Sequence, residues 1–179
     1  MAKNNLRPVI HLQNNGWFDF TDPDNSVYGI EDIARGLSNI ARFSGHTQVP
    51  YSVAQHSVII SHIVPEDYAL QGLLHDAGES FLGDVSKPLK NLLPDYMAIE
   101  DRCEAAILKR FGLPFPLDKS IKIADTIVFV TERRDLQPLA PLDKMYKNIK
   151  PLDEIIVPWT AKVAYKKFMQ RYNQLTKKK

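Results

Sequence analysis

The sequence contains a single cysteine, Cys103, so no disulfide can form within the chain. It has no uninterrupted apolar run of about 18 residues, as a membrane-spanning helix needs, and its first residues lack the apolar stretch of a signal peptide. These absences exclude a disulfide scaffold and favour a cytoplasmic protein in a reducing compartment. A chain of 179 residues can bury roughly 70% of the surface that its unfolded form exposes, so it can hold a core without disulfides.

The sequence also lacks an excess of either charge. Lysine and arginine number 23, aspartate and glutamate number 21, and the net charge is only +2. A nucleic-acid-binding protein concentrates basic residues on one face, whereas the basic tail here is only Lys177-Lys178-Lys179. We therefore expect neither nucleic acid nor a membrane as a partner. Apolar residues at 44% and charged residues at 25% are typical of a globular protein, and the length predicts one domain over residues 1–179.

Apolar residues recur at helical spacing over most of the chain. Ile30, Ile33 and Leu37 follow three- and four-residue steps, as on one face of a helix. Near the N-terminus, alternating residues flank Asn14-Asn15-Gly16, a turn sequence typical of a β-hairpin. We therefore predict an all-α fold, a helical bundle with a small N-terminal β-hairpin. The hairpin and a turn occupy residues 1–26, helices are expected near 30–41, 53–64, 66–77, 95–111 and 118–135, and residues 136–179 form a loop and a C-terminal helix.

The densest chemical signal follows the apolar pair Leu73-Leu74, where His75 and Asp76 stand side by side. Such side chains at the end of a buried helix are costly unless they are paired or bind a metal. His56 lies in an equally apolar helix, and Asp125 lies within the apolar stretch 121–130. Because all four side chains need a partner, we predict that they bind a metal together.

These four residues provide two imidazoles and two carboxylates, with no thiolate. Such a mixed nitrogen and oxygen ligand set suits Mn²⁺, Co²⁺, Fe²⁺, Ni²⁺ or Zn²⁺ in an open catalytic site, with Mg²⁺ allowed as a second ion, and it disfavours a closed structural zinc site. The predicted cofactor is therefore a divalent transition metal.

The order His56…His75-Asp76…Asp125 is accompanied by a more specific string around the His-Asp pair. Together they resemble the HD-domain phosphohydrolases, and in particular the branch that contains bacterial 5′-deoxynucleotidases and small phage dATP triphosphohydrolases. The resemblance covers residues 8–135 and leaves the C-terminal part out. It is carried by His75-Asp76-Ala77-Gly78-Glu79 with Gly83-Asp84, Lys87-Pro88 and Lys90, by Ile30-Glu31-Asp32-Ile33-Ala34 through Asn39 to His46, and by Tyr51 to Ser57.

The resemblance implies an HD-domain helical bundle and a role for each matching residue. His56, His75, Asp76 and Asp125 would be the metal ligands. Glu79 and Asp84 match the family's glutamate and aspartate beside the attacking water and leaving group, which implies general acid or base catalysis. Arg42 and Phe43 match an arginine and an aromatic residue that contact substrate, although the aromatic is commonly Trp in the family. Lys87, Lys90 and His46 complete the candidate substrate-binding residues.

Several of these residues also have simpler interpretations. Glu79 could be a charge at the start of a helix, Asp84 could cap a turn, and Arg42 could be an ordinary cation at a helix end. Lys87 and Lys90 could be solvated surface. Glu132, seven residues after Asp125, could support the metal ligands, but a salt bridge to Arg133 or Arg134 is the favoured interpretation.

The resemblance predicts metal-dependent hydrolysis of a deoxynucleotide and leaves the phosphate group open. The enzyme would release phosphate from a deoxynucleoside 5′-monophosphate or triphosphate from a dNTP such as dATP. Two alternatives remain at this point: a phosphodiesterase for a signalling nucleotide, and a non-catalytic regulator that binds nucleotide or metal. The resemblance also implies a homo-oligomer, for which the sequence itself offers only amphipathic helices.

Overall fold

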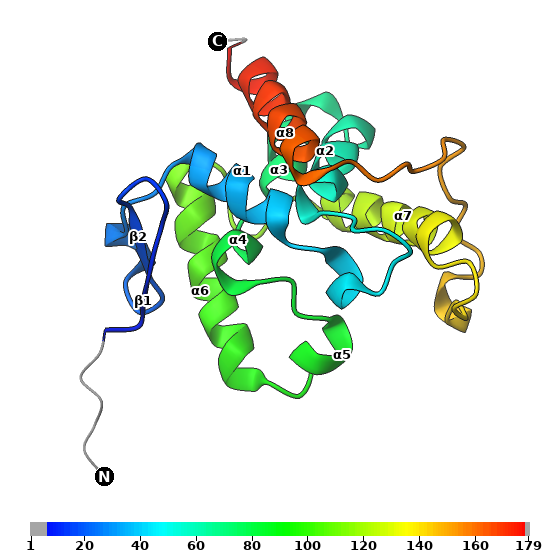
Figure 1. Cartoon of the computed structure of the whole chain (residues 1–179), viewed down its shortest axis with the longest axis horizontal. Coiled ribbons are helices and arrows are strands. Elements are labelled where there is room, and N and C mark those ends of the chain that lie inside the picture. The colour runs from blue at the N-terminus through cyan, green and yellow to red at the C-terminus, as the bar shows by residue number, and fades with distance from the viewer. Residues whose placement is uncertain (1–6, 178–179) are drawn as a thin grey trace.

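The computed structural model describes residues 7–177 and is mostly helical, with one small antiparallel hairpin near its N-terminus (Figure 1). The predicted fold class is confirmed in this respect. Among the described residues, none of the helices has the length and apolar character needed to cross a bilayer. The elements are β1 (Val9–His11), β2 (Trp17–Asp19), α1 (Ile30–Asn39), α2 (Val53–Ile63), α3 (Ala69–Leu74), α4 (Glu79–Leu82), α5 (Lys87–Lys90), α6 (Pro94–Arg110), α7 (Lys119–Leu136) and α8 (Ala161–Thr176), with short 3-10 turns η1 (Pro23–Asn25), η2 (Arg42–Gly45), η3 (Glu66–Tyr68) and η4 (Lys144–Tyr146).

The hairpin attaches to the helices through aromatic rings. Strands β1 and β2 pair antiparallel, with Ile10 opposite Phe18. The Phe18 side chain is fully buried, and its ring stacks on that of Phe81 in α4 with centroids 4.0 Å apart. Tyr28 packs against both rings edge-on. The hairpin therefore closes one side of the main hydrophobic core.

Helix α2 lies at the centre of the bundle. It contacts α1, α3, α7 and α8, and buried residues lie along most of its length. Ser52 caps its N-terminus, where the hydroxyl accepts a hydrogen bond from the Gln55 amide at 3.2 Å. A helix that is apolar on nearly every side has to be buried, so a polar side chain within α2 is held in a rigid, dry setting.

The helix expected over 66–77 is shorter than predicted. A 3-10 turn, η3, precedes α3, and α3 ends at Leu74. The chain then continues through tighter turns, in which the Ala77 amide bonds to the Leu74 carbonyl and the Glu79 amide to the Asp76 carbonyl, both at 3.0 Å. Bonds that span three residues instead of four rotate successive side chains differently from an α-helix. His75 and Asp76 therefore lie on a tightened turn between α3 and α4.

Gly36 lets α1 and α4 approach closely, and α4 carries Glu79. A Cβ atom at Gly36 would lie 2.7 Å from the Ser80 carbonyl oxygen and 2.9 Å from the Ser80 Cα. We predict that Gly36→Ala lowers the free energy of unfolding by about 1–3 kcal/mol, because one helix backbone has to move. Urea denaturation measures this loss. Asn39→Ala, an exposed change in the same helix, should alter it by less than about 0.5 kcal/mol; equal midpoints for the two variants would contradict the role of Gly36.

Candidate metal centre

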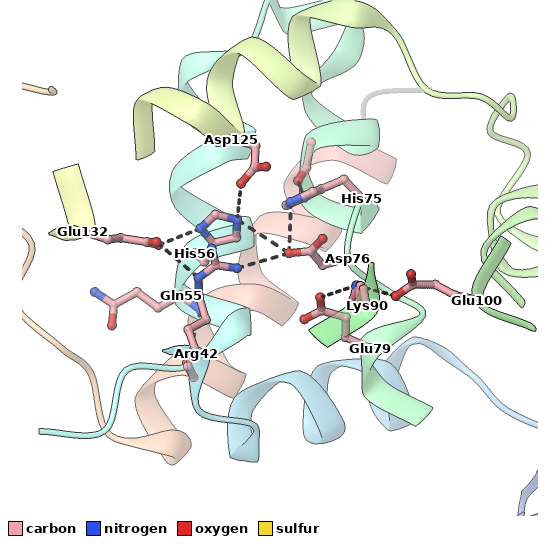
Figure 2. Close-up of polar contacts among 12 residues, drawn as sticks. Arg42, Gln55, His56, His75, Asp76, Glu79, Lys90, Glu100, Asp125 and Glu132 are labelled. Carbon is pink, nitrogen blue, oxygen red and sulfur yellow. Dashed lines mark hydrogen bonds and ion pairs between the residues drawn. The ribbon is translucent and has the colours of Figure 1, made fainter. Parts of the chain in front are cut away.

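The four candidate ligands come from three parts of the bundle. His56 lies within the buried helix α2, and His75 and Asp76 lie on the turn after α3. Asp125 lies on α7, which packs against α2. Figure 2 shows the four side chains pointing toward one another, with Arg42 and Glu132 beside them. Packing among these elements thus gathers residues that span 70 positions of the sequence.

The donor atoms of these residues are close enough to share one ion. One ligand atom from each of His56, His75 and Asp125 lies within 4.8 Å of the others. Asp76 joins them, since its Oδ2 is 3.1 Å from His75 Nε2 and 3.6 Å from His56 Nε2. Asp125 Oδ1 lies 3.2 Å from His56 Nε2. The structure therefore brings all four sequence-predicted ligands together.

Each histidine has one ring nitrogen bound to the protein and one left for a ligand. His56 Nδ1 lies 2.7 Å from Glu132 Oε1, and His75 Nδ1 lies 2.9 Å from the Gly72 carbonyl oxygen. Both neighbours are acceptors, so each Nδ1 donates its proton to the protein and each Nε2 is turned toward the carboxylates of the cluster. Both Nε2 atoms are buried and have no hydrogen-bond partner among the described residues. Buried polar atoms rarely lack a hydrogen bond. Two imidazole nitrogens that face two carboxylates fit a divalent transition metal.

Glu132 is the residue for which sequence reasoning favoured the wrong interpretation and gave the supporting role beside the ligands second place. The favoured prediction, a salt bridge to Arg133 or Arg134, is wrong. The Glu132 side chain is fully buried and contacts His56 through Oε1 and the Arg42 Nε, at 3.3 Å, through Oε2. It lies seven residues after Asp125 on α7, so both face the same side of the helix, and that side turns toward α2. The seven-residue spacing from Asp125 was the signal available in the sequence. It places Glu132 on the same face of the helix as Asp125, but it does not show that His56 and Arg42 are its partners.

Arg42 connects the two sides of the centre. Its Nη1 lies 3.5 Å from Asp76 Oδ2, while its Nε contacts Glu132. Only 12% of its side chain is exposed. A guanidinium held between two carboxylates keeps a positive charge beside the ligands. Arg42 was predicted to bind substrate, and the structure places its guanidinium in an ion pair with the candidate ligand Asp76.

The carboxylates make the centre a favourable place for a cation. Burial and the charge of Arg42 lower the pKa of His56, but Glu132 and Asp125 outweigh them and raise it to about 9. Burial raises the pKa of Asp76, yet His75, His56 and Arg42 together hold it well below its ordinary value. Asp76 is thus an anion. The negative potential that favours a proton on His56 Nε2 favours a metal ion at the same position.

Glu79 and Asp84 lie on the neighbouring side of the centre. Burial, with the charges of Asp76 and Asp84, raises the pKa of Glu79 well above its ordinary value. Glu79 Oε2 is buried without a hydrogen-bond partner in the described chain, and its Oε1 lies 3.9 Å from Lys90 Nζ. Burial also raises the pKa of Asp84, against the opposing charge of Arg42. Lys90, which was predicted to bind phosphate, forms a salt bridge with Glu100. Its ammonium group is therefore already paired with a carboxylate of the protein.

The remaining predicted substrate residues lie outside the cluster. His46 and Lys87 have exposed side chains, and neither makes a polar contact with the four candidate ligands in the part of the chain that the structure describes. Phe43 follows Arg42 and lies under its guanidinium, with the Arg42 Cζ 5.7 Å from the ring centroid. The structure therefore gathers Arg42, Phe43 and Glu79 near the ligands but not His46 or Lys87.

Comparison with known proteins identifies relatives over most of the chain. No family model matches the sequence. The chain is 39% identical over 170 residues to the uncharacterized protein YfdR of Escherichia coli strain K12, a match that covers 89% of this chain and 90% of YfdR. The chain belongs to the YfdR family. An uncharacterized protein of Rhodobacter capsulatus is 40% identical over 123 residues, 61% of this chain and 63% of that relative.

The YfdR match includes the whole candidate metal centre. Coverage of 89% of a 179-residue chain leaves out only about a ninth of it, so the central segment from His56 to Asp125 must lie inside the aligned region. The names of these relatives state no activity, so the chemistry has to be argued from the site itself.

The contact between Glu132 and His56 predicts a measurable effect on metal affinity. Partners of this kind orient a ligating histidine, and their loss typically costs about 10–100-fold in affinity. Glu132→Gln keeps the shape of the side chain and removes its charge, so we expect a weakening in that range for Zn²⁺ or Co²⁺ by isothermal titration calorimetry. Asp101→Asn, an exposed change on α6, should leave the affinity unchanged. Equal affinities for the two variants would show that Glu132 has no such role.

Proposed function

We propose that this member of the YfdR family is a metal-dependent phosphohydrolase of the HD-domain type that acts on deoxynucleotides. The observation that carries the proposal is that the buried Nε2 atoms of His56 and His75, which make no hydrogen bond within the described residues, face the carboxylates of Asp76 and Asp125. A divalent metal held there would polarise a phosphoryl oxygen and make a water molecule more acidic. Two histidines and two carboxylates are an N/O donor set suited to that chemistry.

Arg42 supplies a second positive charge for the phosphate. Its guanidinium lies between Asp76 and Glu132 at the edge of the centre, and the fork of N–H groups is matched to phosphate oxygens. The positive charge of Arg42 would stabilise the negative charge that builds on those oxygens as water attacks phosphorus.

Glu79 is suited to be the general acid. Burial and neighbouring carboxylates raise its pKa, which favours the protonated carboxyl that a general acid needs in order to donate to the leaving oxygen. Asp84, less perturbed and with the Arg42 charge opposing the rise, is suited to accept a proton from the attacking water. Two carboxyl groups with different environments commonly divide acid and base roles in this way.

Phosphate release by the purified protein tests the proposal. We expect the protein to hydrolyse deoxynucleotides when Mn²⁺ or Co²⁺ is present, to lose activity with EDTA and to recover it when metal is restored. Malachite green detects orthophosphate and ion chromatography detects tripolyphosphate, so the two assays across dNMPs and dNTPs separate the two versions. Orthophosphate from dNMPs alone supports a 5′-deoxynucleotidase, whereas tripolyphosphate from dNTPs supports a triphosphohydrolase. Hydrolysis of cyclic dinucleotides alone would support a phosphodiesterase, and metal and nucleotide binding without turnover would support a regulator.

The general-acid role predicts a specific loss on mutation. Glu79→Gln should lower kcat by about 10²–10⁴-fold, as expected for removal of an acid–base group, while metal affinity stays close to that of the wild type. Glu104→Gln is a matched control, because burial, with the charge of Glu100, raises the pKa of that carboxyl to about 7, yet Glu104 is not among the candidate ligands. A comparable kcat for Glu79→Gln and wild type would remove Glu79 from the mechanism.

A further inference from the structure

Three aromatic rings from distant parts of the chain form a continuous surface. Phe43 of η2 and Phe129 of α7 have ring centroids 6.1 Å apart and are tilted by 34°. Phe129 and Tyr146 of η4 are 5.1 Å apart and tilted by 56°. All three side chains are half-buried, so each ring keeps some surface open to a ligand. We call these three residues the aromatic shelf.

The shelf begins where the metal centre ends. Phe129 lies four residues after Asp125 on α7, so the two side chains lie on the same face one helical turn apart. At the other end, Phe43 directly follows Arg42, whose guanidinium contacts both Asp76 and the Phe43 ring. A ligand with a phosphate at Arg42 and the metal ligands would extend onto this surface.

The backbone that carries Phe43 adopts an unusual conformation. Phe43 and Ser44 have positive φ angles of 57° and 52°, and Gly45 follows at 78°. Positive φ is uncommon for residues with a side chain, especially a bulky one. The segment is held from both sides, by a 2.8 Å bond from the Arg42 amide to the Tyr51 carbonyl and by a bond from the Gln137 side chain to the His46 carbonyl. Strain of this kind persists where the surroundings enforce it and is frequent at ligand sites.

We propose that the aromatic shelf binds the base of the nucleotide, with Phe129 and Tyr146 as specificity residues beside Phe43. The inference rests on the proposed function and adds the position and character of the base site. Aromatic rings stack on any base, and a two-ring purine covers more of the surface than a pyrimidine. The shelf therefore favours purine nucleotides through contact area.

Binding of a fluorescent purine tests the shelf without turnover. The probe is 2-aminopurine deoxyribonucleoside 5′-monophosphate, whose emission falls when the base stacks, added to Zn²⁺-loaded protein in the Glu79→Gln background. We expect quenching on binding, and a loss of affinity of about 5- to 100-fold for Phe129→Leu and for Tyr146→Leu, the usual range for one base–aromatic contact. Leu139→Ala is the control from the same loop as Tyr146 and should bind as the parent does. Equal affinities for all four proteins would overturn the proposal.

A substrate pair separates this inference from the proposed function. With Glu79 intact, Phe129→Leu should raise KM for purine nucleotides 5- to 100-fold and leave hydrolysis of the base-free ester with the same phosphate group, 2-deoxyribose 5-phosphate or 2-deoxyribose 5-triphosphate, unchanged. An equal loss on both substrates would mean that the shelf is structural only, while the phosphohydrolase assignment stands. If no substrate is hydrolysed but the probe still requires Phe129, the shelf stands and the proposed function fails. Thermal melting of each variant checks that it is folded.

Discussion

The candidate site depends on one buried carboxylate, that of Glu132. A charge removed from water costs several kcal/mol unless other groups compensate it, and Glu132 is compensated by His56 at 2.7 Å and Arg42 at 3.3 Å. The two contacts join α7 to α2 and to η2. The contact with Glu132 also fixes a proton on His56 Nδ1 and turns Nε2 toward Asp76 and Asp125. Burial and the positive groups act in opposite directions on Glu132, and the positive groups prevail, since its pKa is lowered.

The other residues of the site lie either on buried helices or on the short turns that connect helices. His56 sits in α2, which is buried against four helices, so its ring has little room to move. Phe43 and Tyr146 lie instead on short turns between helices. A rigid scaffold that positions chemistry, with loops that contact the ligand, is a common arrangement. In this protein the metal centre belongs to the scaffold, and the proposed base site belongs mainly to the connections.

Helices that begin at a capping side chain were predicted close to their observed bounds, because the capping hydrogen bond joins residues that are near in sequence. Ser52, Asp118 and Thr160 each accept a hydrogen bond from an amide in the first turn of the helix that follows. The helix expected over 66–77 was less well predicted, because apolar spacing does not distinguish bonds of three residues from bonds of four. That difference matters for the site, since the tightened turns after Leu74 set the directions of His75 and Asp76.

The sequence by itself determined which residues could bind a metal and on which helices most of them lie, because a polar side chain in an apolar run needs a partner and helical spacing assigns its face. Only the tertiary structure decided what those partners are. Glu132 meets His56 across 76 positions and Arg42 across 90, and Lys90 is held by Glu100. Contacts of this range depend on how helices pack, and packing is set by the whole core together, not by any one segment.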